Sequence, residues 1–594
     1  MHYLKRNPLS YLLAKGWEHA QGVRLRIVGF WLMFIVANAI HIIGQPLVWA
    51  KVMDTVQLEG ITESSFKTLT LLLLLTILLE IAFWAFHGPA RVIEEVAAFR
   101  IRANYRRFLL GGILVLPLEW HANHHSGDTI DKVEKGAMGL HQFSTNTFLA
   151  ISGLVQLFGS YVMLTYFCPW AGVIVGGMIL VTAWITVRFD RVLVAQYKEI
   201  YRAENAVSES VFDSISNITT VIILRVEKLV FDAIMHKIEL PYELVKRNIV
   251  LNEIKWFLTN MCCAFMAAGV LSVYFWQNIG GTESILVGSL YLLIQYLTRV
   301  SEQFYQFTSL YGDILQRKSR VMNAEELSVD FKSENFNNHC LPQEWQKLTI
   351  KGLSFSYGGE NTDLHLEDLS LSISRGERIA LVGETGSGKT TLLKVMRDLY
   401  HPIGLTLSVD GSVIPHGFEG ISRAIALVPQ NPEIFATTIE ENITLGAEYD
   451  MDFVQRFISM ACFSDVVEQL PRGLASSIKE RGVNLSGGQQ QRLALSRGLL
   501  ACHDKDIVLL DEPTSSLDGV TEMQVYQNIF RGFEGKTILS SIHRLHLLPL
   551  FDRICMFSGG KIIATGTLEE LLQSCPQFTS LWEAMKHVTE SSST

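Results

Sequence analysis

The residues Gly383–Thr390 read GETGSGKT and fit the spacing GxxxxGK[ST]. They follow the apolar run RIALV and precede the helical run TLLKVMRDLY. Glycines let the backbone turn tightly enough for its N–H groups to surround phosphate oxygens, and the N-terminus of the following helix adds a favourable dipole. The lysine would bring positive charge to β- and γ-phosphates, and the threonine hydroxyl would bind Mg²⁺. We therefore predict a nucleotide site made by Gly383, Glu384, Thr385, Gly386, Ser387, Gly388, Lys389, Thr390 and Thr391.

Two acidic residues end another apolar run, DIVLLDEP, about 120 residues further on. Ile507–Leu510 read as a buried strand, so that Asp511 and Glu512 would stand at its carboxyl end. Asp511 would hold Mg²⁺, directly or through water, and Glu512 would polarise the attacking water. Two acids at a strand end can also cap a helix, but a phosphate loop in the same chain favours the catalytic interpretation.

Leu485–Arg492 read LSGGQQQR, and here the chain resembles the ABC transporter ATPases, whose signature is LSGGQ. The resemblance implies that Tyr357 stacks on adenine, that Gln430 binds Mg²⁺ and links its site to the membrane domain, and that His543 is the switch histidine near the γ-phosphate. The short run KERG, residues 479–482, resembles an exporter motif. The signature residues would be Leu485, Ser486, Gly487, Gly488 and Gln489. The loop that crosses between subunits would be Ser515, Ser516, Leu517 and Asp518.

Two residues depart from the family pattern in this half of the chain. Ser516 stands where alanine is usual, and Ser541 precedes the run IHR. Neither is expected to touch a catalytic atom.

The composition indicates a membrane part as well as a soluble part. The chain has 594 residues, of which 48% are hydrophobic and 18% charged, and its mean hydropathy is +0.24. Soluble domains carry about 25% charged residues, and a chain of this length exceeds one hydrophobic core. The net charge of −9 offers no basic excess for nucleic acid. Eight cysteines without a CxxC pair favour buried, reduced thiols.

Six apolar segments are long enough to span a bilayer, which needs roughly 20 apolar residues. They lie near residues 27–50, 69–86, 146–167, 172–187, 256–276 and 285–308. We expect a segment of residues 1–26, a transmembrane domain of residues 27–320, a linker of residues 321–344 and a nucleotide-binding domain of residues 345–594. The fold class would be a bundle of six long membrane helices joined to an α/β P-loop ATPase domain.

Lysine and arginine are concentrated in three segments: residues 1–26, the segment between spans two and three, and the segment between spans four and five. The positive-inside rule therefore places both termini and the ATPase domain in the cytoplasm of a multi-pass protein of the inner or plasma membrane. The two inner basic segments read as helices that extend the spans into the cytoplasm.

Six spans followed by one such ATPase resemble a half-size ABC exporter of type I, also called type IV. The resemblance implies two paired chains, as a homodimer or a heterodimer, with each ATP held between the phosphate loop of one chain and the signature of the other. Alternating access in the bilayer would then export a substrate, which the sequence does not identify, or flip a lipid. The alternative is a nucleotide-gated channel or regulatory membrane protein on the same scaffold, but intact Glu512 and His543 favour a pump. The 26 residues before the first span leave no room for the peptidase of bacteriocin exporters.

The run HANHHSGD, residues 121–128, has three histidines and an aspartate, a composition that suggests a metal site. The resemblance instead makes it the tip of the first cytoplasmic extension, a coupling helix that docks on the ATPase. Gly127 would form the turn, and Asp128 would cap the next helix. A metal site and a pH-sensitive contact remain open alternatives. The coupling candidates are Trp120, His121, His124, His125 and Gly127.

Polar residues inside the spans are costly and are candidates for a substrate pathway. This set consists of His41, Gln45, Glu80, Gln295, Arg299 and Glu302. An alternative is that Arg299 and Glu302 form a structural ion pair.

Overall fold

The computed structural model describes residues 7–279, 286–331, 340–357, 364–431, 433–478 and 485–591. The KERG motif at residues 479–482 lies outside these ranges. Apart from residues 117–119, the chain divides into a helical unit that ends at Lys332 and an α/β unit that begins at Ser333.

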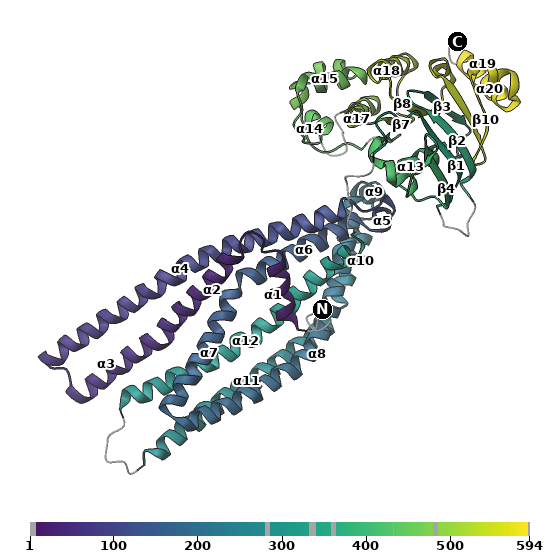
Figure 1. Cartoon of the computed structure of the whole chain (residues 1–594). Helices are drawn as coiled ribbons and strands as arrows, with labels where there is room; N and C mark the ends of the chain where they lie inside the picture. The colour runs from purple at the N-terminus through teal and green to yellow at the C-terminus, as the bar shows by residue number, and fades with distance from the viewer. Residues whose placement is uncertain are drawn as a thin grey trace. The chain divides into compact units, whose positions relative to one another are not determined.

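The helical unit consists of long helices joined by short turns (Figure 1). Its elements are α1 (Pro8–Glu18), α2 (Arg24–Ala39), the π-helix η1 (Ile40–Gly44), α3 (Gln45–Glu59), α4 (Glu63–Ile113), α5 (Leu118–Asn123), α6 (Ser126–Thr145), α7 (Thr147–Phe167), α8 (Pro169–Ser216), α9 (Ile218–Ile223), α10 (Glu227–Glu239), α11 (Tyr242–Gln277), α12 (Val287–Leu327) and the 3₁₀ turn η2 (Ser328–Asp330).

Five helical segments among the described residues are long and apolar enough to cross a membrane, and they include the first five predicted spans. The sixth predicted span lies on α12, which does not meet the same criterion of composition. Polar side chains on α12 lower its mean hydropathy. Two of them, Arg299 and Gln303, are buried inside the helical unit.

The structure adds detail at two places along the helical unit. Helix α12 continues past residue 320 to Leu327, because Val321, Ala324 and Leu327 are buried in the core that α12 shares with α4 and α6. The linker is therefore shorter at its start than predicted. The segment before the first span is also structured, since α1 is a helix whose N-cap, Asn7, accepts hydrogen bonds from two backbone N–H groups.

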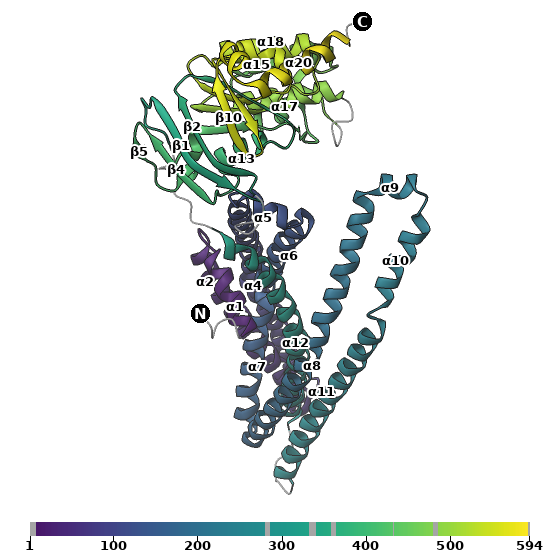
Figure 2. The ribbon, with the colours of Figure 1, turned by 90° about the vertical axis from the view of Figure 1, so that its right-hand side faces the viewer.

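Helices α8 and α11 form a paired arm (Figure 2). A buried ion pair joins them, with 3.1 Å between Lys255 Nζ and Asp190 Oδ1. The positively charged amine therefore has its partner inside the arm, where an unpaired charge would be costly. Helices α9 and α10 connect the ends of this pair.

The α/β unit contains two sheets. The elements are β1 (Lys347–Phe355), β2 (Leu366–Ser374), β3 (Arg378–Gly383), α13 (Lys389–Met396), β4 (Gly404–Val409), β5 (Ser412–Val413), η3 (Gly417–Ala424), β6 (Ile425–Val428), α14 (Ile439–Thr444), α15 (Met451–Met460), α16 (Ser464–Gln469), η4 (Gly473–Ala475), α17 (Gly487–Ala501), β7 (Ile507–Asp511), α18 (Gly519–Gly532), β8 (Thr537–Ser541), η6 (Leu545–Leu550), β9 (Arg553–Ser558), β10 (Lys561–Gly566), α19 (Leu568–Ser574) and α20 (Pro576–Ser591).

The larger sheet has the order β10-β9-β3-β8-β7-β6, and all its pairs are parallel except β9 with β10. Alternate residues of its strands face two different cores: Val508 and Leu510 pack with the helices α14–α18, while Ile507 and Leu509 pack toward the antiparallel sheet β2-β1-β4-β5. Burial on both sides fixes the strand register. The loops after β3, β6, β7 and β8 therefore meet at one edge of the sheet, where ligands of open α/β sheets bind.

Candidate nucleotide site

The predicted phosphate loop lies between β3 and α13, as expected. Gly386 and Gly388 have φ angles of 82° and 106°, which favour glycine. A Cβ on Gly388 would stand 2.9 Å from Leu366 Cδ2 and 3.1 Å from the carbonyl oxygen of His365. The loop therefore needs glycine at this position both for its backbone conformation and for space.

Lys389 lies over the loop and not in solvent. Its Nζ donates hydrogen bonds to the carbonyl oxygens of Gly383 at 2.7 Å and Glu384 at 3.0 Å. Burial lowers the pKa of Lys389, while Glu512 and Asp511 act in the opposite direction. The ammonium group is thus positioned at the loop, next to the acidic pair that the sequence predicted.

Asp511 is the centre of a small set of oxygen atoms. Its Oδ1 accepts hydrogen bonds from Thr390 Oγ1 at 2.9 Å and from Ser541 Oγ at 2.8 Å. Thr390 and Asp511 are thus brought together as predicted, and their oxygens are ligands of the kind that Mg²⁺ prefers. Among the described residues, no three His, Cys, Asp or Glu side chains are grouped as a metal site.

The expectation that Ser541 touches no catalytic atom was wrong. In addition to its bond to Asp511, Ser541 Oγ accepts a hydrogen bond from the backbone N–H of Glu512 at 3.0 Å. These contacts follow from the parallel pairing of β7 with β8, which places Asp511 beside Ser541. The sequence alone does not reveal this register.

The carboxylate of Glu512 is held from two sides. Gln430 Nε2 donates to Glu512 Oε2 at 2.7 Å, and His543 Nε2 lies 2.6 Å from Glu512 Oε1. Glu512 has a φ angle of 45°, a left-handed conformation that few non-glycine residues adopt. The three predicted catalytic residues therefore meet, each from the end of a different parallel strand.

The signature begins helix α17 and is tied to the loop of residues 515–518. Ser486 is the N-cap: its Oγ accepts from Gln489 N–H at 3.3 Å, and Gln489 Oε1 accepts from Ser486 N–H at 2.9 Å. Gln491, which the sequence reasoning did not single out, donates to Ser515 Oγ at 3.0 Å and accepts from Ser516 N–H at 2.7 Å. Asp518 caps α18.

Tyr357, the predicted adenine partner, is 46% exposed. Its ring stands edge-on to those of Phe355, His365 and Tyr400, with centroids 4.9, 4.9 and 5.1 Å away. The hydroxyl of Tyr357 lies 3.4 Å from Thr391 Oγ1 at the start of α13. His365 and Tyr400 support the ring, although the sequence offered no motif for them.

Two hydrogen bonds join polar candidates of the spans to each other or to a backbone carbonyl. Gln45 Nε2 donates to Glu80 Oε2 at 2.7 Å, and Arg299 Nη1 donates to the carbonyl oxygen of His41 at 3.3 Å. No ion pair within 4.0 Å joins Arg299 and Glu302, both of which the structure describes, so the alternative of a structural ion pair is not seen. Gln295 is partly buried, and Glu302 is exposed.

The coupling candidates lie on α5, on α6 and between them. Trp120 stacks on His124 with centroids 4.0 Å apart, and its Nε1 donates to Asp330 Oδ2 at 2.9 Å. The predicted cap is wrong: α6 begins at Ser126 after His125, which makes no side-chain cap bond, and Asp128 pairs with Lys132 at 2.7 Å. His121 stands edge-on to Trp120, and a Cβ on Gly127 would lie 3.3 Å from Phe212.

Two family models match the chain. The model of the ABC transporter transmembrane region matches residues 28–303, and the ABC transporter model matches residues 366–515. The chain is 31% identical over 324 residues to the glutathione/L-cysteine transport system ATP-binding/permease protein CydD of Bacillus subtilis (strain 168), covering 53% of this chain and 55% of that protein. It is 36% identical over 270 residues to an ATP-dependent lipid A-core flippase of Burkholderia thailandensis, covering 44% of each.

A solved structure has the same fold. The structure of a bacterial Atm1-family ABC exporter with ATP bound superposes with a TM-score of 0.81 at 21% identity, covering 95% of this chain and 98% of that one. The alignments span about half the length of the curated relatives named above. The two matched family models together cover most of the sequence, and the chain belongs to the ABC transporter family.

Proposed function

We propose that this chain is the half-size protomer of an ATP-driven exporter or lipid flippase. The observation that carries the proposal is the position of the Glu512 carboxylate, which Gln430 and His543 hold beside the Asp511–Thr390 pair. A carboxylate fixed next to a phosphate loop and a Mg²⁺-binding pair is the arrangement that ATP hydrolysis requires. A gate that only binds nucleotide would not need it.

Each residue would have a separate role in hydrolysis. Lys389 and the N–H groups of the loop would bind the phosphates, and Tyr357 would stack on adenine. Glu512 would orient the attacking water and accept its proton, and His543 would fix the position of Glu512 and of the γ-phosphate. Mg²⁺ bound by Thr390, Asp511 and Gln430 would neutralise phosphate charge.

A second chain would complete each site. The N-terminus of α17, with Ser486 as its cap, offers N–H groups to an anion. In the proposed dimer these groups bind the ATP held by the partner's phosphate loop. The partner would be a second copy of this chain or a related chain, and closure of the pair would drive the membrane helices between inward-open and outward-open states.

The basic segments support an orientation with both termini and the ATPase unit in the cytoplasm of a cell membrane. The transported compound would then move outward along the polar residues of the spans. The named relatives do not share one substrate: CydD is named for glutathione/L-cysteine transport, and the Burkholderia thailandensis protein for flipping lipid A-core.

Replacing Glu512 tests the proposal. Glu512→Gln preserves size and one hydrogen-bond acceptor but removes the base, so ATP turnover in lipid nanodiscs should fall by at least about 10²-fold while ATP binding persists. Glu534→Gln, at an exposed position after α18, is the matched control and should leave turnover unchanged. Equal turnover in the two variants would refute the assignment.

A further inference from the structure

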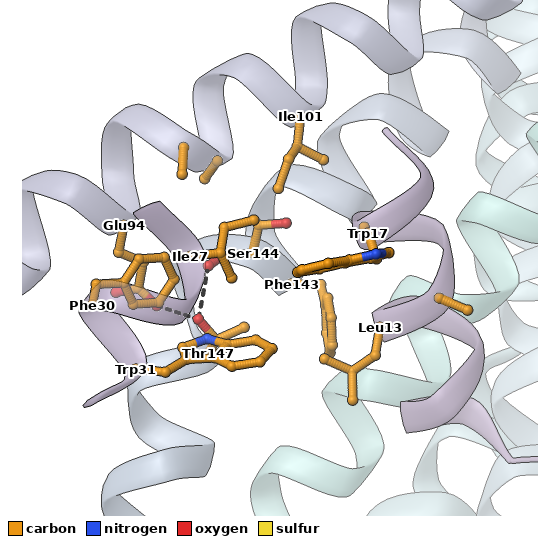
Figure 3. A pocket seen from close by; sticks show the side chains of 14 residues that line it. Leu13, Trp17, Ile27, Phe30, Trp31, Glu94, Ile101, Phe143, Ser144 and Thr147 are labelled. Atoms are coloured by element: carbon orange, nitrogen blue, oxygen red, sulfur yellow. Dashed lines mark hydrogen bonds between the residues drawn. The ribbon is translucent and has the colours of Figure 1, made fainter. Parts of the chain in front are cut away.

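A cavity of about 340 Å³ lies inside the helical unit, between the N-terminal helix and the start of the first span (Figure 3). It is lined by α1, α2, α4 and α6 and by the first residue of α7. The space exists because α1 and α4 contribute small residues, Gly16, Ala97 and Ala98, where larger side chains would fill it. Trp17, Trp31, Phe30 and Phe143 form aromatic walls.

The carboxylate and hydroxyl groups that line the cavity are hydrogen-bonded within the protein. Glu94 accepts hydrogen bonds from Thr147, Arg91 and the backbone N–H of Phe148, and Ser144 Oγ donates to a carbonyl of its own helix at 2.9 Å. The indole N–H of Trp31 is buried without a partner in the described residues. Because this nitrogen is buried away from solvent, a molecule in the cavity does not reach it. The apolar walls therefore suit an apolar molecule.

The rim of the cavity is apolar on the outside and basic at one end. Leu13 and Trp17 of α1 line the cavity but are 39% and 42% exposed. Leu25 of α2 is 90% exposed, and α2 belongs to a segment able to cross a membrane. The guanidinium of Arg24 lies 5.4 Å from the centre of the Trp17 ring. Arg24 and Trp31 are seven residues apart, which places them on one face of α2.

We propose that this cavity binds one acyl chain of an anionic glycerophospholipid from the surrounding bilayer. The chain enters past Leu13 and Trp17, and the phosphate group lies by Arg24. Apolar walls and a cation at the rim match these two parts of a phospholipid. The inference requires only that α2 and α4 lie in a membrane, and it stands apart from ATP hydrolysis.

Photolabelling of the full chain in nanodiscs tests the inference. The probe is phosphatidylglycerol with a diazirine near the end of one acyl chain, and mass spectrometry locates the label. We expect labelled peptides that contain the α1 and α4 walls of the cavity. Phosphatidylcholine with the same acyl chain should label wild type less, and Arg24→Gln should remove this difference.

A variant that fills the cavity sharpens the test. A Cβ on Gly16 meets no atom within 4 Å, so the side chain of Gly16→Leu can enter the cavity without moving the backbone. Displacing about two methylene groups of the lipid should reduce labelling by about tenfold. Gly29→Leu is the matched control, because Gly29 lies on α2, also has no atom within 4 Å of its added Cβ, and does not line the cavity.

Equal labelling of the α4 peptides in Gly16→Leu and Gly29→Leu would overturn the proposal, as would wild-type label confined to α8 or α12. Equal labelling of wild type by the two lipids would overturn the role of Arg24. Ala14→Trp, at an exposed residue of the rim, repeats the test should Gly16→Leu fail to fold. Unchanged labelling in that variant would also overturn the proposal.

Discussion

Replacing Ser541 by alanine should weaken both the fold and the use of Mg²⁺. The hydroxyl of Ser541 donates to the Asp511 carboxylate at 2.8 Å and accepts from the N–H of Glu512 at 3.0 Å. Without it, Asp511 keeps Thr390 as a partner but loses the contact that fixes its orientation from β8. The N–H of Glu512, a residue in a left-handed conformation, loses its acceptor.

The size of the effect follows from these two bonds. A hydrogen bond to a charged group contributes about 1.5–3 kcal/mol, and a buried N–H left without a partner costs about 1–3 kcal/mol. Because the two losses share one side chain and the site can relax, we expect Ser541→Ala to lower the free energy of unfolding by about 2–4 kcal/mol. The Mg²⁺ concentration for half-maximal ATPase activity should rise about tenfold, the lower end for loss of an outer-shell partner.

Ser540→Ala is the matched control. Ser540 is the preceding residue on β8, is equally buried, and shares a hydrogen bond of 2.8 Å with Tyr526 on the other side of the strand. Its loss should cost about 1 kcal/mol of stability and leave the Mg²⁺ dependence unchanged. ATPase activity titrated with Mg²⁺ at fixed ATP, together with thermal unfolding, separates the two variants. A half-saturating Mg²⁺ concentration within about twofold of wild type in Ser541→Ala would refute the reasoning.

Three further outcomes are expected. Cysteines placed at positions 389 and 486 should cross-link only between chains, as gel mobility reports, and an intrachain product would contradict the shared ATP site. Trp120→Ala loses the hydrogen bond to Asp330 and the stacking on His124, so it should lower substrate-stimulated ATPase activity more than basal activity. A variant with all three histidines of HANHHSGD replaced by Gln should have the same zinc content as wild type, as mass spectrometry reports. Burial raises the pKa of the Cys502 thiol to about 12, so that about 10⁻⁴ of it is thiolate at pH 8; iodoacetamide should modify the exposed Cys340 in the native protein and Cys502 only after unfolding.

The sequence predicted the parts of the site that are contiguous in the chain. The phosphate loop, the acidic pair and the signature each occupy a few successive residues whose chemistry depends on local spacing. The role of Ser541 was not predicted, because its contact with Asp511 joins residues 30 positions apart and depends on the register of two parallel strands. Gln491 was missed for a similar reason, since its partners lie in a loop more than 20 residues away.

In the helical unit too, features that depend on contacts between distant parts of the sequence could not be predicted. Apolar length predicted six spans, and five of them lie on described helices that are long and apolar enough to cross a membrane. The sixth lies on α12, where the polar residues Arg299 and Gln303 are buried against other helices. The cavity behind Trp31 could not be predicted, because its walls come from helices far apart in the sequence. Asp128 was expected to cap a helix, but α6 begins at Ser126, three residues earlier than that role requires.

The two hydrogen bonds of Gln491 have a consequence for when the two nucleotides of the proposed dimer are released. They join the start of the signature helix to residues 515 and 516 as one rigid piece. In the proposed dimer, that piece would touch the nucleotide of one site with its signature and approach the other site with its loop. Opening either site would then shift the groups that face the other, so the two nucleotides could not be released as independent events. ATP turnover plotted against ATP concentration would depart from a simple hyperbola, and Gln491→Ala, which separates helix from loop, would bring it back toward one.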